Sequence, residues 1–177
     1  MVADPLAKLH EVFGYSQFRG VQEQVVDRVL GKQRTLAVMP TGAGKSLCYQ
    51  VPALVRPGTA LVISPLIALM EDQVRALTAQ GVRAATLNSQ SADGGQVWRD
   101  FVDGQLDLLY VSPERALSDG FGQMVQRTEI ALVAIDEAHC VSQWGHDFRP
   151  EYRRLRPFCG ALPGVPRIAL PATADRE

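Results

Sequence analysis

The chain has 177 residues, of which 46 % are hydrophobic and 21 % are charged, and its formal net charge at pH 7 is −1. These values are typical of one globular domain with a sizeable core, and they exclude a disordered or strongly basic chain, so any nucleic-acid site must be local. With no apolar run of membrane-spanning length and no C-x-x-C spacing among its three cysteines, we expect a cytoplasmic domain over residues 1–177 with reduced thiols and no membrane partner.

Apolar, β-branched segments alternate with helical patterns along the chain. Strands are predicted at 35–39, 60–63, 84–87, 106–111, 131–135 and 167–170. Helices are predicted near 17–30, 45–55, 66–80, 94–102, 113–126 and 150–157. This alternation, with nearly continuous apolar strands, predicts an α/β fold whose mostly parallel central sheet is covered by helices on both faces. Ligands of such sheets bind at the carboxyl ends of the strands.

The segment from Phe13 to Gln22 precedes the first predicted strand. The amide of Gln22 can offer a donor and an acceptor to an adenine edge, and Tyr15 and Arg19 can stack on the faces of the base. The alternative is an amphipathic helix in which Gln22 is solvated and Phe18 lies in the core. The residues alone leave both interpretations open.

A glycine-rich loop follows the first predicted strand and opens the next helix, with the sequence Met39-Pro-Thr-Gly-Ala-Gly-Lys-Ser46. Its small residues let backbone N–H groups approach a phosphate chain, Lys45 supplies a charge for the outer phosphates, and the hydroxyl of Ser46 can bind Mg²⁺. The strict pattern G-x-x-x-x-G-K-[ST] fails at Met39, so a glycine-rich turn without a ligand is the alternative. The expected nucleotide-binding residues here are Thr41, Gly42, Ala43, Gly44, Lys45 and Ser46.

Two serine–proline pairs, Ser64-Pro65 and Ser112-Pro113, each end a predicted strand and open a helix. Helix N-termini offer backbone N–H groups to phosphates, and proline suits the first turn. The same feature on two strands of one sheet indicates a track for nucleic-acid phosphates with Ser64, Pro65 and Ser112 as contacts. A plain helix start is the alternative.

Two carboxylates, Asp136 and Glu137, follow the apolar run Ile130–Ile135. A carboxylate at a strand end can hold a metal ion, and Glu137 beside it can orient and deprotonate a water. Adjacent carboxylates after a buried strand cost free energy unless a cation compensates them, which argues against a solvated acidic pair. With the glycine-rich loop, they form an NTP-hydrolysing site whose expected catalytic residues are Lys45, Asp136 and Glu137.

Residues 139–156 combine four arginines with Trp144, Phe148 and Tyr152. Aromatic side chains stack on bases, at about 1–3 kcal/mol per base, and arginines pair with phosphates, so the segment is predicted to bind single-stranded nucleic acid. The alternative is a loop whose aromatic side chains fill a small satellite core.

Taken together, these motifs resemble the first RecA-like lobe of RecQ-type DNA helicases, within helicase superfamily 2. The matching segments are Leu9–Gln22 for motif 0, Met39–Ser46 for motif I, Val62–Val74 for motif Ia, Leu109–Arg115 for motif Ib, Asp136–His139 for the DEAH-box motif II, and Cys140–Tyr152 for an aromatic-rich loop. The resemblance implies a three-layer, RecA-like P-loop fold. It also implies an ATP- and Mg²⁺-dependent enzyme that moves 3′ to 5′ and unwinds DNA in repair and recombination.

The resemblance also implies residue roles. Gln22 would read adenine between Tyr15 and Arg19. Lys45 would contact the β- and γ-phosphates, Ser46 and Asp136 would hold Mg²⁺, Glu137 would be the general base, and His139 and Gln143 would lie near the γ-phosphate. Trp144, His146, Phe148 and Arg149 would sense single-stranded DNA.

At motif III the chain reads Ala169-Leu-Pro-Ala-Thr-Ala174, where the family usually has Ala-Leu-Thr-Ala-Thr-Ala. Pro171 lacks both the hydroxyl and the N–H, so a hydrogen bond from that position to the Asp136 region would be lost.

We expect a second lobe in a longer chain, single-stranded and partly duplex DNA as partners, a monomeric state and a nucleoid-associated location. The alternatives are a non-catalytic ATP- or DNA-binding module and a small-molecule P-loop kinase, for which substrate-binding inserts are not evident.

Overall fold

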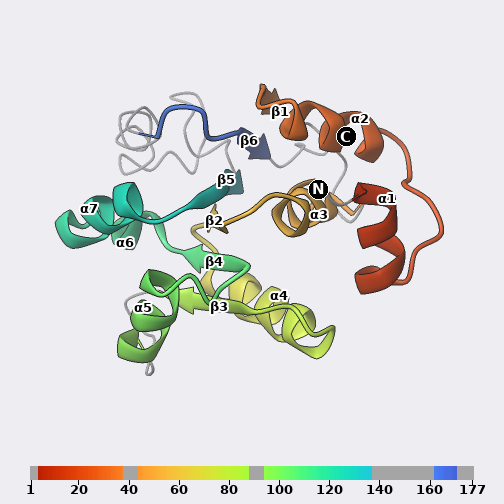
Figure 1. Ribbon diagram of the computed structural model, residues 1–177. Coiled ribbons are helices and arrows are strands. Elements are labelled where there is room, and N and C mark those ends of the chain that lie inside the picture. The colour runs from red at the N-terminus through yellow and green to blue at the C-terminus, as the bar shows by residue number, and fades with distance from the viewer. Residues whose placement is uncertain (1–3, 38–43, 88–93, 137–161, 171–177) are drawn as a thin grey trace, which may run out of the picture.

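The computed structural model describes residues 4–37, 44–87, 94–136 and 162–170, and the strands within them form one sheet (Figure 1). The strands are β1 (Arg34–Leu36), β2 (Thr59–Ile63), β3 (Ala84–Leu87), β4 (Leu108–Val111), β5 (Ile130–Asp136) and β6 (Arg167–Leu170). Their order across the sheet is β1-β6-β5-β2-β4-β3, and every neighbouring pair is parallel. The predicted α/β class with a parallel sheet is therefore confirmed.

Helical segments connect the strands. The first half of the chain contains α1 (Pro5–Lys8), a short π-helix η1 (Leu9–Phe13), α2 (Gln22–Leu30), α3 (Leu47–Val55) and α4 (Ile67–Ala79). The second half contains α5 (Gly94–Val102), α6 (Pro113–Ala116) and α7 (Asp119–Arg127). No helix in the described ranges is long and apolar enough to cross a bilayer.

The two faces of the sheet are covered by different helices, as Figure 1 shows. Successive side chains of a strand point to opposite faces. Ala60, Val62 and Tyr110 therefore pack with buried side chains of α2, α3 and α4. Leu61 and Val111 pack on the other face with buried side chains of α5, α6 and α7. The result is the predicted three-layer arrangement.

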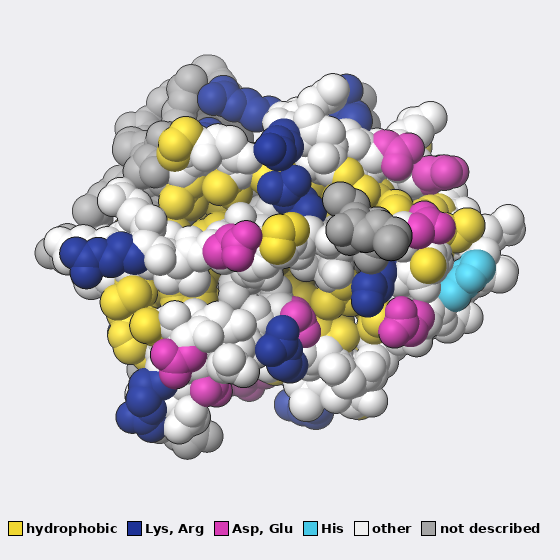
Figure 2. Space-filling model, viewed as in Figure 1, with side chains coloured by type: hydrophobic (Ala, Val, Ile, Leu, Met, Phe, Trp, Pro, Cys, Tyr) yellow, Lys and Arg dark blue, Asp and Glu magenta, His cyan; other side chains and the backbone are white. Residues whose placement is uncertain are grey.

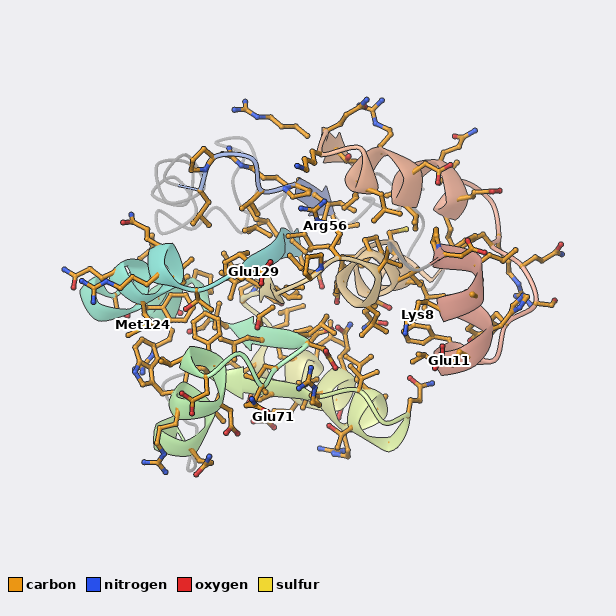
Figure 3. All side chains as sticks on the ribbon, viewed as in Figure 1. Lys8, Glu11, Arg56, Glu71, Met124 and Glu129 are labelled. Carbon is orange, nitrogen blue, oxygen red and sulfur yellow. The ribbon has the colours of Figure 1, made fainter. Side chains whose placement is uncertain are left out.

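A smaller cluster fixes the N-terminal segment to α3. Leu9 of η1 and Val26 of α2 are buried together with Val51 and Val55 of α3. Arg56, which directly follows α3, donates its Nε–H to the carbonyl oxygen of Ala131 on β5 at 2.8 Å (Figure 3). These contacts hold α3 firmly, and α3 in turn sets the position of the residues just before it.

Each predicted strand overlaps an observed one, although β1 ends at Leu36, β4 begins at Leu108, and residues 38–39 of the first predicted strand lie outside the described residues. Helix boundaries differ more. The helix predicted at 17–30 begins at Gln22, because residues 14–21 form a loop in which Gly14 and Gly20 have φ of 75° and 56°. The helix predicted at 113–126 is divided, since Ser118 adopts an extended conformation between α6 and α7. The segments α1 and η1 were not predicted, and the helix predicted at 150–157 lies outside the described residues.

Candidate functional site

Two of the predicted catalytic side chains meet at the carboxyl edge of the sheet. Lys45 lies just before α3, Asp136 ends β5, and Lys45 Nζ is 3.1 Å from Asp136 Oδ1. The Asp136 side chain is only 4 % exposed. A carboxylate buried to this degree is costly unless a cation compensates it. Lys45 therefore supplies the positive charge that the buried Asp136 carboxylate requires. We refer to the glycine-rich segment 39–46, which contains Lys45, as the predicted phosphate loop.

Gln22 joins the loop before α2 to the phosphate loop. Its Nε2 donates to the carbonyl oxygen of Gly44 at 3.0 Å, and its Oε1 accepts from the backbone N–H of Arg19 at 2.8 Å. Gln22 is buried, not solvated as the amphipathic-helix alternative required, although that alternative had correctly made it part of a helix. Its amide thus has a structural function that the sequence did not reveal.

Gly44 lies where Gln22 makes its closest approach. Its φ is +72°, in the left-handed region that favours glycine, and a Cβ built on it would overlap Gln22 Nε2. This position needs a glycine for both its backbone conformation and its lack of a side chain.

A pocket of about 240 Å³ opens beside the phosphate loop, between η1, the start of α3 and α4. Tyr15, Gly44 and Ser46 are among its lining residues, as are Gln50 and Gln73. Its volume lies just below the range of small-molecule sites, about 300–1,000 Å³. The structure thus brings Tyr15 and Ser46 to one cavity.

The side chains of Tyr15 and Arg19 are exposed, so both are accessible to a base that stacks on them. The loop that carries them is fixed at its start, where the ring Nε2 of His10 lies 2.6 Å from the carbonyl oxygen of Ser16. Arg19 is fixed at the other end through its bond to Gln22.

Two buried tyrosines lie on the sheet side of α3, and sequence reasoning missed them. Tyr49 of α3 and Tyr110 of β4 have hydroxyls 3.1 Å apart, with rings in an edge-to-face arrangement. Burial raises the pKa of Tyr110 to about 12, and the negative charge of Asp136 adds to the effect. Burial, then Tyr110 and then Asp136, raise the pKa of Tyr49 well above its ordinary value. Each looks in sequence like an ordinary core aromatic.

The two predicted phosphate-track serines accept hydrogen bonds from nearby backbone N–H groups. Ser64 and Ser112 are buried at the carboxyl ends of β2 and β4. Ser64 Oγ accepts from the N–H of Leu66 at 3.2 Å, and Ser112 Oγ accepts from the N–H of Arg115 at 3.3 Å. The helix-start interpretation therefore explains the hydroxyl of Ser112, which caps α6, whereas Ser64 bonds in the turn before α4. The neighbouring backbone lies at the same edge of the sheet as Lys45.

Comparison with known families matches residues 19–177 to the DEAD/DEAH box helicases. The chain belongs to this family. It is 52 % identical over 172 residues to the ATP-dependent DNA helicase RecQ of Haemophilus influenzae, which covers 96 % of this chain and 28 % of that protein. It is 47 % identical over 173 residues to the ATP-dependent DNA helicase RecQ of Bacillus subtilis, covering 96 % of this chain and 29 % of that protein.

A solved structure shows the same fold. It is that of the Mycobacterium smegmatis helicase Lhr bound to ssDNA and AMP-PNP, with a TM-score of 0.71 and 21 % identity over 97 % of this chain and 26 % of that chain. The resemblance to the first lobe of RecQ-type helicases is confirmed by the sequence relatives. This DEAD/DEAH box helicase chain spans less than a third of their length.

Several residues predicted for a helicase site lie outside the described residues. They are Thr41, Gly42 and Ala43 of motif I, Glu137 and His139 of motif II, and Gln143, Trp144, His146, Phe148 and Arg149 of the aromatic-rich loop. Pro171 of motif III does too. Their assigned roles stay predictions.

Proposed function

We propose that this chain is the ATP-binding, single-stranded-DNA-sensing motor lobe of a 3′-to-5′ DNA helicase that works with a second lobe. The observation that carries the proposal is the 3.1 Å pair between Lys45 and the buried Asp136, at the edge where parallel sheets bind ligands. The names of the sequence relatives support ATP and DNA as the ligands.

The residues present fit a magnesium nucleotide. Asp136 is a buried carboxylate already compensated by a cation, and with the hydroxyl of Ser46 it offers the oxygen ligands that Mg²⁺ prefers. Ser46 and Asp136 would hold this ion, which when bound neutralises charge on the outer phosphates. Lys45 would turn from Asp136 to the β- and γ-phosphates.

The remaining steps use neighbouring residues. Glu137, next to Asp136, would accept the proton of the attacking water, with His139 and Gln143 near the γ-phosphate. Tyr15 and Arg19, exposed on their loop, would stack on adenine while Gln22 keeps that loop on Gly44. The nucleotide would thus bridge the N-terminal loop and the phosphate loop.

DNA would bind along the same edge of the sheet. Ser64 Oγ and Ser112 Oγ each accept a local backbone bond, which leaves their O–H groups able to donate to phosphates beside the backbone N–H groups near these strand ends. On the face in Figure 2, Lys and Arg side chains are interspersed with Asp and Glu, so contacts would be local. Trp144, His146, Phe148 and Arg149 would add stacking and charge.

The proposal is tested by Mg²⁺-dependent binding of a fluorescent ATP analogue to Lys45→Ala and to Lys8→Ala. Lys8 forms a partly exposed ion pair of 3.7 Å with Glu11, which contributes little to stability, and it serves as the matched control. We expect Lys45→Ala to abolish binding and Lys8→Ala to bind like the original chain. Equal binding by both variants, or no Mg²⁺ dependence, would contradict the nucleotide site. Binding of nucleotide and DNA without turnover in the longer, two-lobed protein would indicate the non-catalytic module.

A further inference from the structure

Four buried or half-buried side chains form a continuous series of hydrogen bonds across the helix layer, which we call the amide–tyrosine network: Gln50, Tyr110, Tyr49 and Gln73. Gln50 Nε2 donates to the hydroxyl of Tyr110 at 3.1 Å, and the hydroxyl of Tyr49 donates to Gln73 Oε1 at 2.7 Å. The two hydroxyls are 3.1 Å apart. The network thus joins α3, β4 and α4.

The network has one direction. A tyrosine hydroxyl has a single hydrogen, and that of Tyr49 is used on Gln73, so Tyr110 must donate to Tyr49. Each hydroxyl then donates once and accepts once, from the Gln50 amide at one end to the Gln73 carbonyl at the other. Bonds in such a series polarise one another in a low-dielectric interior, so loss of one weakens the rest.

Both ends of the network reach the nucleotide pocket. Gln50 and Gln73 line the same pocket as Gly44 and Ser46. The middle of the network lies close enough to Asp136 for that carboxylate to raise the pKa of both tyrosines. A ligand bound at Gly44 and Ser46 would therefore contact the ends of the network, Gln50 and Gln73. It would also lie near Asp136, beside the two tyrosines at the centre of the network.

The two helices that the network joins are anchored unequally. In α3, seven of the nine residues are buried, and Arg56 fixes its end to β5. In α4, a helix of 13 residues, only Met70 and Leu77 are buried. With Ile67 and Val74 only partly buried against the core, α4 is held by less apolar packing than α3, and its described link to Tyr49 is through Gln73.

We propose that the amide–tyrosine network couples nucleotide binding to DNA binding, with Gln73 as the positioning residue that fixes α4 relative to α3. The inference rests on the proposed function, which places ATP at the start of α3 and DNA near the carboxyl ends of β2 and β4, the first of which leads into α4. Nucleotide in the pocket alters the packing at Gln50 and Gln73, and the network transfers that change to α4. By linkage, DNA at α4 changes ATP affinity by the same factor.

The test measures the affinity of the 177-residue chain for a non-hydrolysable ATP analogue with Mg²⁺, with and without an oligo-dT strand. The ratio of the two affinities is the coupling, which in allosteric proteins is about 5–150-fold. Gln73→Met keeps the size of the side chain but removes the acceptor, and Tyr49→Phe removes the donor. Gln73→Glu keeps an acceptor. Gln96→Met makes the same exchange at an exposed position of α5, on the opposite face of the sheet.

We expect Gln73→Met and Tyr49→Phe to reduce the coupling to less than about twofold, and Gln73→Glu and Gln96→Met to retain it. Gln73→Met leaves the buried Tyr49 hydroxyl without this acceptor and should lower the melting temperature modestly, so coupling is compared at a temperature at which every variant is folded. Coupling that persists in Gln73→Met, or is absent from an original chain that binds both ligands, would overturn the inference alone. An original chain that binds neither ligand would overturn the proposed function as well.

Discussion

Gly44 is the residue at which the geometry of the site is most restrictive. Its φ of +72° already disfavours any residue with a Cβ, and the Gln22 amide occupies the space where that Cβ would lie. Gly81 has a similar φ of +85°, but nothing lies within 4 Å of its Cβ position. A comparison of alanine variants at the two positions therefore distinguishes the cost of backbone strain alone from the added cost of overlap with a neighbouring side chain.

Gly44→Ala is expected to destabilise the chain by more than Gly81→Ala, for which left-handed strain alone should cost about 1–2 kcal/mol. Gly44→Ala should also weaken binding of an ATP analogue, because Gln22 must move from the phosphate loop. Urea unfolding and analogue titration of both variants check this. If the double variant Gly44→Ala, Gln22→Ala is no more stable than Gly44→Ala, the overlap with Gln22 does not explain the loss.

Tyr110 makes the stability of the fold sensitive to alkaline pH. Its folded-state pKa of about 12 lies above the ordinary value of 10.0, so between these values the unfolded chain has released a proton that the folded chain retains. The stability from this group is complete below pH 10 and is lost as pH rises toward 12, at about 1.4 kcal/mol per unit. The free energy of unfolding, measured with urea between pH 8 and 11, should therefore fall less steeply with pH in Tyr110→Phe than in the original chain. Equal slopes would contradict a buried, protonated Tyr110.

At the scale of elements, the loop before α2 and the phosphate loop act as one unit because Gln22 bonds to both. If Gln22 also reads adenine, its amide must serve the base as well as the two loops, or exchange partners when ATP binds. The two functions predict different losses. Loss of a base contact weakens ATP more than GTP, whereas loss of the link between loops weakens both equally.

Gln22→Ala is expected to reduce ATP-analogue affinity by about 1–3 kcal/mol and to narrow the preference for ATP over GTP. Calorimetric titration with both nucleotide analogues measures the two effects. Gln24→Ala, at an exposed position of the same helix, is the control. An unchanged preference with reduced affinity would leave the link between loops as the sole function of Gln22, and unchanged affinity would exclude both functions.

The elements show why some of the fold could be predicted and some could not. The strands were predictable because each contains a short apolar run, and in β2 and β4 every residue is buried. In β3 and β6 some residues are only partly buried, but the apolar residues still mark the strand. The start of α2 was not, because residues 14–21 are held by the bond between Gln22 and Gly44, which are 22 positions apart. Local periodicity contains no information about such a bond.

At the scale of the whole molecule, some contacts of the candidate site could likewise be predicted from the sequence and others could not. Lys45 and Asp136 could be expected to meet, because parallel strands deliver their carboxyl ends to one edge of the sheet. The contact between Tyr49 and Tyr110 depends on how α3 is rotated against β4, which no sequence spacing specifies. The amide–tyrosine network can therefore be found only from the packing of the folded chain, whereas the predicted phosphate loop can be found from the sequence.

The 177-residue chain by itself is expected to fold and bind nucleotide but to hydrolyse ATP very slowly. Its buried core spans both faces of the sheet, so folding does not require another lobe. Hydrolysis differs, because motor ATPases commonly complete the site with an arginine from a second lobe, a contribution of about 10³–10⁵ in rate. Phosphate release should be compared, with and without single-stranded DNA, between this chain and a two-lobed protein that contains it. In the two-lobed protein, Glu137→Gln should bind ATP but fail to turn it over, if Glu137 acts on the attacking water as we propose. Turnover by the shorter chain at rates near those of the two-lobed protein would show that the site is complete without the second lobe.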